Sequence, residues 1–206
     1  ISRLIKINYT FLKHLLGYLK ERLTYRYKKS LPFKYQLFPR RLRLSFEELG
    51  PTFIKLGQLI SMNPGVFPKS LIDEFTNCQD SMPPFSSFEA KEIIKEELGD
   101  KAKEILSNFE DKPLAAASIA QVHGTVLPCG KEAVIKIQRK NIRKIIDIDI
   151  ELMTFICKVI MFIYPRIKGA NPLGIIKNFK ELIHLELDFI KEGKNLERFK
   201  EIYSDD

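Results

Sequence analysis

Residues 113–139 contain two short runs of strand-type residues on either side of a Pro-Cys-Gly turn. The first run, residues 121–127, follows a segment of small residues, and the second, residues 132–138, carries a lysine in its middle. Runs of this length around a glycine-containing turn are typical of a β-hairpin. We therefore expect residues 109–138 to form a small antiparallel sheet, which limits how the flanking segments can fold.

The segment before the first strand contains almost no bulky side chains. A loop that lies close over nucleotide phosphates must lack bulk, and a strand lysine presents its ammonium to phosphate from a fixed direction. Ordinary protein kinases use glycines in this loop, whereas this chain has alanines. Lys136, in Ala-Val-Ile-Lys, stands at the position of the strand lysine. The loop residues are Ala115, Ala116, Ala117 and Ser118.

Two polar motifs lie outside the hairpin. Residues 49–59 contain a Lys-x-Gly-Gln element, which places Lys55 and Gln58 on one face of an expected helix. Residues 185–195 contain a Glu-x-Asp element followed by a second glutamate. Its acidic residues are Glu186, Asp188 and Glu192. Each motif alone is a common polar helix pattern, so the information lies in their combination and order.

Taken in order, the Lys-x-Gly-Gln element, the alanine-rich loop, the strand lysine and the Glu-x-Asp element resemble the UbiB family. These are atypical protein-kinase-like proteins, called the ADCK group in animals. The resemblance covers residues 44–199. It implies an α+β fold, with a kinase-like small lobe built on a small antiparallel sheet and an added N-terminal helical domain that carries the Lys-x-Gly-Gln motif.

The resemblance also assigns roles to residues. It implies that the alanine loop, Lys136 and Glu192 hold ATP, with Glu192 pairing with Lys136. Sequence spacing alone instead nominates Glu151 as the partner of that lysine, as in ordinary kinases. The remaining residues form a polar set that covers the nucleotide site and occludes a protein substrate. That set is Lys55, Gln58, Glu186 and Asp188, with Lys55 and Glu186 as its ion pair.

For the complete protein the resemblance implies binding of ATP and magnesium, and ATP hydrolysis coupled to the handling of quinone-precursor lipids alongside ubiquinone-biosynthesis proteins. It disfavours protein phosphorylation, because the Lys-x-Gly-Gln helix obstructs the substrate position. The implied location is the cytoplasmic face of the bacterial inner membrane.

The parts of a complete kinase-like active site are absent from this sequence. None of the histidines His14, His123 and His184 begins a His-x-Asp element, and Asp188-Phe189 is followed by isoleucine rather than glycine. We therefore expect no catalytic residue and no metal ligand in this chain, and an N-terminal portion of a longer protein whose large lobe is missing. The alternative is a non-enzymatic, truncated or split-gene product that acts only as a membrane- or partner-binding module.

Charge is concentrated at the N-terminal end of the chain. Residues 1–43 contain twelve Lys or Arg and one acidic residue, Glu21, a net of +11, whereas the whole chain carries +8. Apolar residues interleave with these cations at helical spacing, which suits an amphipathic helix. That helix either packs on the protein's own body or contacts an anionic membrane through residues 1–30. Nucleic-acid binding is disfavoured, because the cations are not spread over a recognised binding fold.

We expect three parts, namely a basic helical arm (1–43), a helical domain with the Lys-x-Gly-Gln motif (44–108) and the kinase-like small lobe (109–206). In the arm we expect a loop around Pro32 and Pro39, and then a helix that begins at Ser45 as N-cap. Further helices are expected from 142 to 164 and from Pro172 to Phe199. The three cysteines show no metal-binding spacing and are expected to be free thiols.

Overall fold

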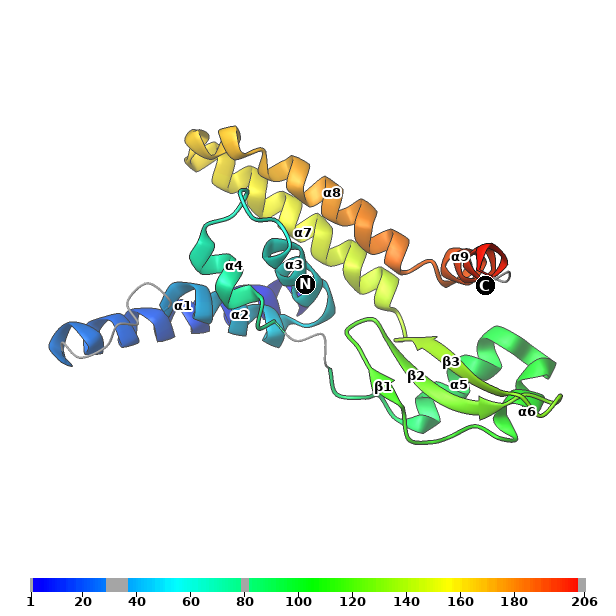
Figure 1. Cartoon of the computed structure of the whole chain (residues 1–206). Coiled ribbons are helices and arrows are strands. Elements are labelled where there is room, and N and C mark those ends of the chain that lie inside the picture. The colour runs from blue at the N-terminus through cyan, green and yellow to red at the C-terminus, as the bar shows by residue number, and fades with distance from the viewer. Residues whose placement is uncertain (1, 29–36, 79–81, 204–206) are drawn as a thin grey trace. The chain divides into compact units, whose positions relative to one another are not determined.

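The computed structural model describes residues 2–28, 37–78 and 82–203. The chain divides into two compact units, Ile1–Ile142 and Arg143–Asp206. Within the first unit, a helical part comes before a part built around a sheet (Figure 1). The three-part division predicted from the sequence stays a prediction.

The helical part consists of α1 (Ser2–Lys28), α2 (Leu37–Leu49), α3 (Pro51–Ser61) and α4 (Lys69–Phe75). Its centre is an aromatic cluster around Phe46, whose ring lies 5.0 Å from Phe75, 5.5 Å from Phe53 and 6.4 Å from Phe11, measured between centroids. All three pairs meet edge to face, which is a favourable arrangement for aromatic rings. Each helix of this part therefore contributes an aromatic side chain to one shared core.

One boundary in this part differs from the prediction. Helix α2 begins at Leu37, so Pro39 lies in its first turn and Ser45 lies inside the helix rather than at its N-cap. Proline is tolerated in a first turn, because the backbone N–H that it lacks has no helical partner there. The buried Ser45 hydroxyl donates to the carbonyl of Leu42 within the helix, 2.6 Å away. Pro32 falls outside the described residues.

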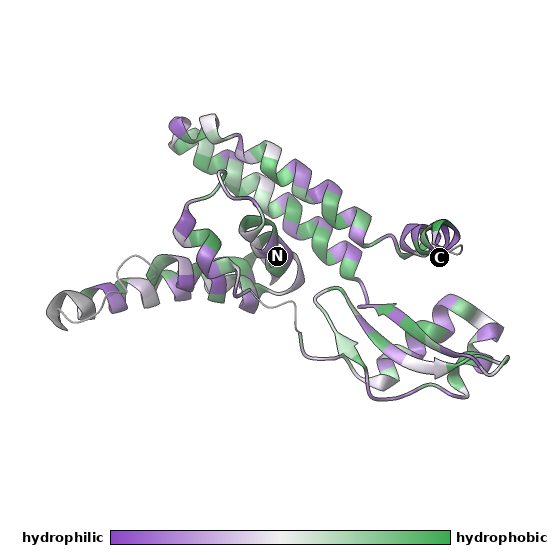
Figure 2. Ribbon diagram, in the orientation of Figure 1, coloured by the Kyte–Doolittle hydropathy of each residue, from purple (hydrophilic) through white to green (hydrophobic). Residues whose placement is uncertain are grey.

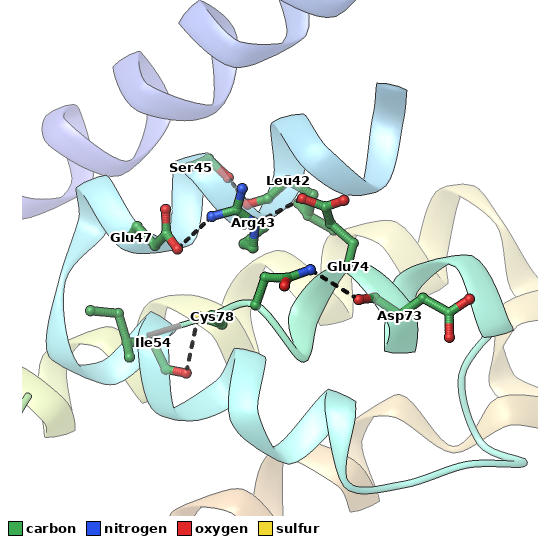
Figure 3. Close-up of polar contacts among 9 residues, drawn as sticks. Leu42, Arg43, Ser45, Glu47, Ile54, Asp73, Glu74 and Cys78 are labelled. Carbon is green, nitrogen blue, oxygen red and sulfur yellow. Dashed lines mark hydrogen bonds and ion pairs between the residues drawn. The ribbon is translucent and has the colours of Figure 1, made fainter. Parts of the chain in front are cut away.

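Ion pairs join α2 to its neighbours. Arg43 Nε donates to Glu74 of α4 at 2.8 Å, and its Nη1 donates to Glu47 of α2 at 2.6 Å (Figure 3). Between α1 and α2, Lys13 Nζ donates to Glu48 at 2.8 Å. Arg43–Glu74 and Lys13–Glu48 therefore link α2 to α4 and to α1, whereas Arg43–Glu47 lies within α2.

The sheet part begins with α5 (Ser87–Leu98), a 3₁₀ turn (Gly99–Lys101) and α6 (Ala102–Leu106). Ser86 caps α5, because its hydroxyl accepts a hydrogen bond from the N–H of Glu89 at 3.1 Å. The strands follow as β1 (Ala115–Ala116), β2 (Ala120–Val126) and β3 (Glu132–Gln138), all antiparallel in the order β1-β2-β3. The predicted hairpin, with its turn at Gly130, is therefore confirmed.

One face of this sheet packs on the helices. Ile137 of β3 is buried with Ala90 and Ile94 of α5, and Ile135 packs against the same cluster. Since side chains alternate along a strand, Lys136 projects from the opposite face of the sheet. The predicted α+β arrangement, helices with one small antiparallel sheet, is confirmed.

The second unit is a helical hairpin followed by a shorter helix. Helix α7 (Ile142–Ile163), whose first residue closes the first unit, leads through a 3₁₀ turn (Pro165–Ala170) into α8 (Pro172–Glu186), and α9 (Phe189–Ile202) follows (Figure 1). Asp147 Oδ1 of α7 and His184 Nε2 of α8 lie 3.0 Å apart, so these two long helices are neighbours at this point. No helix in the described part of the chain combines the length and apolar character that crossing a bilayer requires.

The single helix predicted from Pro172 to Phe199 is in fact two helices. The chain leaves the helical conformation at Asp188, whose φ is −91° and ψ is 81°. The Asp188 carboxylate then caps α9, because it accepts a hydrogen bond from the N–H of Lys191 at 2.9 Å. The capping aspartate therefore starts a new helix within what resembled one continuous helical pattern.

Candidate functional site: the Lys136 face of the small sheet

Two predicted site residues, Ala115 and Lys136, lie in one row across the sheet with Val122 between them. Ala115 of β1 lies opposite Val122 of β2, and Val122 lies opposite Lys136 of β3. Directly opposed residues in an antiparallel sheet share a face, so these three side chains project on the side away from α5, which we call the Lys136 face. The exposed Lys136 side chain is therefore in line with Ala115 of β1, whose side chain is only a methyl group.

The three-residue turn between β1 and β2, residues 117–119, is closed by a backbone hydrogen bond. The N–H of Ala117 donates to the carbonyl of Ala120 at 2.8 Å, and Ser118 and Ile119 at the tip are buried. Among the described residues other than glycine, only Asn141 and Asn171 have positive φ, so the alanines of this loop need no glycine-like conformation. Alanine therefore fits this turn without strain.

Arg139, at the end of β3, holds this turn in place. Its backbone N–H donates to the carbonyl of Ile119 at 3.0 Å. Its guanidinium donates twice to the carbonyl of Ala117, from Nε at 3.2 Å and from Nη2 at 3.0 Å. The same Nη2 also donates to the carbonyl of Pro83 at 3.0 Å. One side chain thus links the alanine loop, the strand end and the segment before α5.

The environment of Arg139 is partly buried. Its guanidinium lies 5.5 Å from the ring centroid of Phe85, within range of a cation–π contact. Burial lowers the pKa of Arg139, although Glu89 acts in the opposite direction, and arginine remains charged at any ordinary pH. This residue was not identified from the sequence, because its role depends on contacts with two separate segments, the turn at residues 117–119 and the segment at residues 83–85.

The other face of the sheet carries a buried polar network. Gln121 Oε1 accepts from the N–H of Phe85 at 3.1 Å, and its Nε2 donates to His123 Nε2 at 2.8 Å. His123 Nδ1 then donates to the carbonyl of Glu110 at 2.7 Å, and its ring stacks on Phe109. Because an amide N–H can only donate and a carbonyl can only accept, the proton of His123 is on Nδ1. His123 is therefore a structural residue.

Ala116 lies on that packed side of the sheet, since it pairs with Gln121. The structure thus separates the predicted loop residues into two groups. Ala115 shares the face of Lys136, whereas Ala116 lies opposite a residue of the buried network, and Ala117 is the anchor point of Arg139.

The Lys-x-Gly-Gln motif lies on α3, where both Lys55 and Gln58 are partly exposed. Gly57 between them is buried against α4. A Cβ at this position would lie 2.7 Å from Cδ1 of Phe75 and 3.2 Å from the sulfur of Cys78. The glycine thus allows α3 and α4 to approach closely, a packing role that the motif alone does not reveal.

The acidic predicted residues all belong to the second unit. Glu186 is exposed at the end of α8, Asp188 is the N-cap of α9, and Glu192 lies in the first turn of α9. Glu151, the alternative partner of the strand lysine, is exposed on α7. The expected pairs Lys136–Glu192 and Lys55–Glu186 would each join the two units, and both stay predictions.

Within the part of the chain that the structure describes, no group of three or more His, Cys, Asp and Glu side chains lies together as a metal site would require. The Lys136 face of the sheet offers the cation of Lys136, which suits phosphate. The Glu110 carboxylate also lies on this face, because a Cβ at Gly124 of β2 would lie 2.6 Å from Glu110 Oε2.

Comparison with known protein families identifies this arrangement. The model of the ABC1 atypical kinase-like domain matches residues 77–206, which include the sheet, Arg139 and the Glu-x-Asp element. The chain belongs to this family. The kinase-like small lobe predicted from the sequence, with its resemblance to UbiB proteins, is therefore confirmed.

Individual relatives are similar over most of this chain. It is 41% identical over 160 residues to the chloroplastic protein ACTIVITY OF BC1 COMPLEX KINASE 7 of Arabidopsis thaliana, covering 77% of this chain and 23% of that protein. It is 36% identical over 165 residues to a probable protein kinase UbiB of Pseudomonas putida, covering 80% and 31%. The chain therefore spans less than a third of the length of these relatives.

A solved structure shows the same fold. The structure of the Rv3197–erythromycin complex from Mycobacterium tuberculosis superimposes with a TM-score of 0.51 at 28% sequence identity. The match covers 89% of this chain and 45% of that chain.

Proposed function

We propose that this chain is the nucleotide-binding small lobe of a UbiB-like atypical kinase or ATPase that supports ubiquinone biosynthesis. The observation that carries the proposal is the row Ala115–Val122–Lys136 on the Lys136 face of the sheet. A strand lysine next to a loop without bulk is the arrangement with which kinases hold nucleotide phosphates. Membership of the ABC1 family supports the same interpretation.

The ligand is ATP, with Lys136 contacting its phosphates and the turn at Ala117 lying over them. Arg139 acts as a positioning residue, because its guanidinium is engaged with the backbone of that turn. Glu192 is the proposed partner of Lys136. Magnesium is proposed for the complete protein, together with ATP.

Lys55, Gln58, Glu186 and Asp188 form the proposed polar set that covers the nucleotide and occludes a protein substrate. The complete protein would then hydrolyse ATP while handling quinone-precursor lipids, together with other ubiquinone-biosynthesis proteins. We place it at the cytoplasmic face of a bacterial inner membrane. The names of the UbiB relatives support the biosynthetic role.

Helix α1 provides a proposed membrane contact. One face of α1 packs on α2 and buries Ile7, Thr10 and His14. A second face of α1 remains exposed. Its apolar residues recur at intervals of four and three positions along the helix. This stripe consists of Ile5, Tyr9, Leu12, Leu16, Leu19 and Leu23. Lys6 and Lys20 flank it, so an anionic bilayer is the surface that complements it.

The nucleotide proposal is tested with the 206-residue chain by measuring ATP affinity by equilibrium binding. We expect Lys136→Ala to weaken ATP binding at least about tenfold, because it removes a charge-assisted contact to phosphate. A loss of about 1.4 kcal/mol in binding free energy corresponds to a tenfold loss in affinity. Lys131→Ala, at the exposed hairpin turn, is the matched control and should change nothing. We expect no ATP hydrolysis by this chain, because its sequence has neither a His-x-Asp nor an Asp-Phe-Gly element. Equal affinity in both variants would contradict the proposal.

A further inference from the structure

The end of the α7–α8 hairpin exposes an unusual number of large apolar side chains. We call residues 158–168 the hairpin tip. Its exposed apolar residues are Val159, Ile160, Phe162, Ile163, Tyr164 and Ile167. Phe162 is 86% exposed and Tyr164 is 68% exposed, although such residues are normally half-buried or better in a soluble domain. A contiguous exposed apolar patch of this kind marks an interaction surface.

The charges around the hairpin tip all have the same sign. Lys158, Arg166 and Lys168 lie within it, and residues 152–180 contain no aspartate or glutamate at all. A partner surface must therefore be apolar and also negatively charged or rich in anions.

We infer that the hairpin tip inserts into the surface of an anionic lipid bilayer. Apolar and aromatic side chains entering the acyl boundary, with Lys and Arg reaching back to anionic headgroups, are typical of interfacial segments. Figure 2 shows that hydrophobic residues predominate along α7, which leads into the tip. Since no described helix can span a bilayer, the contact is a shallow insertion rather than a crossing.

A second copy of the chain is a poorer occupant of this surface. Pairing two hairpin tips would bring Lys158, Arg166 and Lys168 of each copy together without any acidic residue of residues 152–180 to balance them. The bilayer contact of the hairpin tip is independent of the proposed nucleotide site, because it does not use the sheet. It is also separate from the proposed membrane contact of α1.

The absence of tryptophan from the chain allows a direct test. A Phe162→Trp variant would place a single indole at the hairpin tip. A Phe88→Trp variant would place it on α5, where Phe88 is 73% exposed. Both are conservative changes at exposed positions, so both variants are expected to fold. Each is titrated with vesicles of phosphatidylcholine alone and of phosphatidylcholine with phosphatidylglycerol.

We expect the indole emission of the Phe162→Trp variant to shift to shorter wavelength with anionic vesicles only. The emission should also be quenched by brominated acyl chains, and the shift should be lost as salt rises. The Phe88→Trp variant should show none of these changes. A Phe162→Asp/Ile163→Asp variant should partition at least about tenfold less, because two apolar groups leave the bilayer.

Three outcomes would overturn the inference. The first is binding of the Phe162→Trp variant to anionic vesicles while its emission stays unshifted, which would leave α1 as the contact. The second is an equal response of this variant to neutral and anionic vesicles. The third is an emission shift that follows protein concentration without vesicles, which would mean that a second copy covers the hairpin tip.

Discussion

The guanidinium of Arg139 donates two hydrogen bonds to the carbonyl oxygen of Ala117, and its backbone N–H donates to the carbonyl of Ile119. The end of β3 is thereby fixed to both sides of the turn that joins β1 to β2. Arg139, which lies outside the turn, therefore holds its backbone through these hydrogen bonds.

The first prediction tests this anchor. We expect Arg139→Lys to loosen the turn, because a lysine ammonium cannot reproduce the planar fork that donates to Ala117 and Pro83 together. Hydrogen–deuterium exchange of residues 114–120 should become faster by about tenfold, which corresponds to about 1.4 kcal/mol of local stability. Exchange elsewhere in the sheet should change less.

Arg143→Lys is the matched control, since Arg143 is an exposed arginine a few residues further along the chain. If both variants exchange at the wild-type rate in residues 114–120, the bonds from Arg139 do not hold the turn.

The second prediction concerns Gly57 in the Lys-x-Gly-Gln motif. A methyl group at this position would lie 2.7 Å from Phe75, a fully buried ring at the centre of the helical part. We expect Gly57→Ala to lower the free energy of unfolding by about 1–3 kcal/mol, because overpacking forces the ring or the helix to move.

Gly193→Ala in α9 is the control for that substitution, because nothing lies within 4 Å of its Cβ position. There the same change should be neutral or stabilising by up to about 1 kcal/mol, since alanine is the better helix former. The measurement is the thermal stability of both variants relative to wild type. If Gly57→Ala were as stable as wild type, the glycine would not be needed for the packing of α3 on α4, and only a functional role in the motif would remain.

The sheet and the order of the elements were predictable from the sequence because their signals are local. The turn at Gly130 and the alternation of Ile135 and Ile137 with Lys136 are readable within ten residues. The Lys-x-Gly-Gln and Glu-x-Asp motifs predicted which helical parts come before and after the sheet. Boundaries were less predictable, since Ser45 looked like an N-cap but lies inside a helix that begins at Leu37.

The site was only partly predictable, for physical reasons. The alanine loop and Lys136 were identified as residue types, but the register that puts Ala115 rather than Ala116 on the face of Lys136 is set by strand pairing. The role of Arg139 depends on carbonyl groups 22 and 56 residues away, which no local pattern encodes. Asp188 was identified for the Glu-x-Asp motif, and its function as a helix cap was missed.

The third prediction concerns pH. Hydrogen bonds from Lys13 and then from His14 hold the pKa of Glu48 below its usual value of 4.5. A carboxylate whose pKa is lower in the folded state stabilises that state at pH values above its unfolded pKa, and this contribution is lost as the pH falls through the folded value. We expect the contact between α1 and α2 to weaken below about pH 4.5.

The measurement is the urea midpoint of the chain between about pH 3 and pH 7, a range that spans the titration of a carboxyl group. Glu48→Gln should be less stable than wild type near neutral pH, and the difference should shrink as the pH falls. The effect should be modest, since the Glu48 side chain is 34% exposed and solvent screens the pair. Glu97→Gln, at an exposed position of α5, is the control. A constant difference between Glu48→Gln and wild type across this range would contradict the linkage.

The last prediction concerns the alanine loop and builds on the proposed nucleotide site. Ala117 has a negative φ and a carbonyl held by Arg139, so glycine is not needed for the shape of the turn and would add only freedom. We expect Ala117→Gly to cost about 0.5–1 kcal/mol of stability and to change the ratio of ATP to ADP affinity by a larger factor. Ala116→Gly, which lies opposite Gln121 on the packed side, should lower stability by a similar amount with a smaller effect on that ratio. Affinities and melting temperatures are measured for both. If melting falls in both variants while both affinity ratios stay at the wild-type value, the alanines serve packing alone, and the sheet face rather than the loop carries any nucleotide contact.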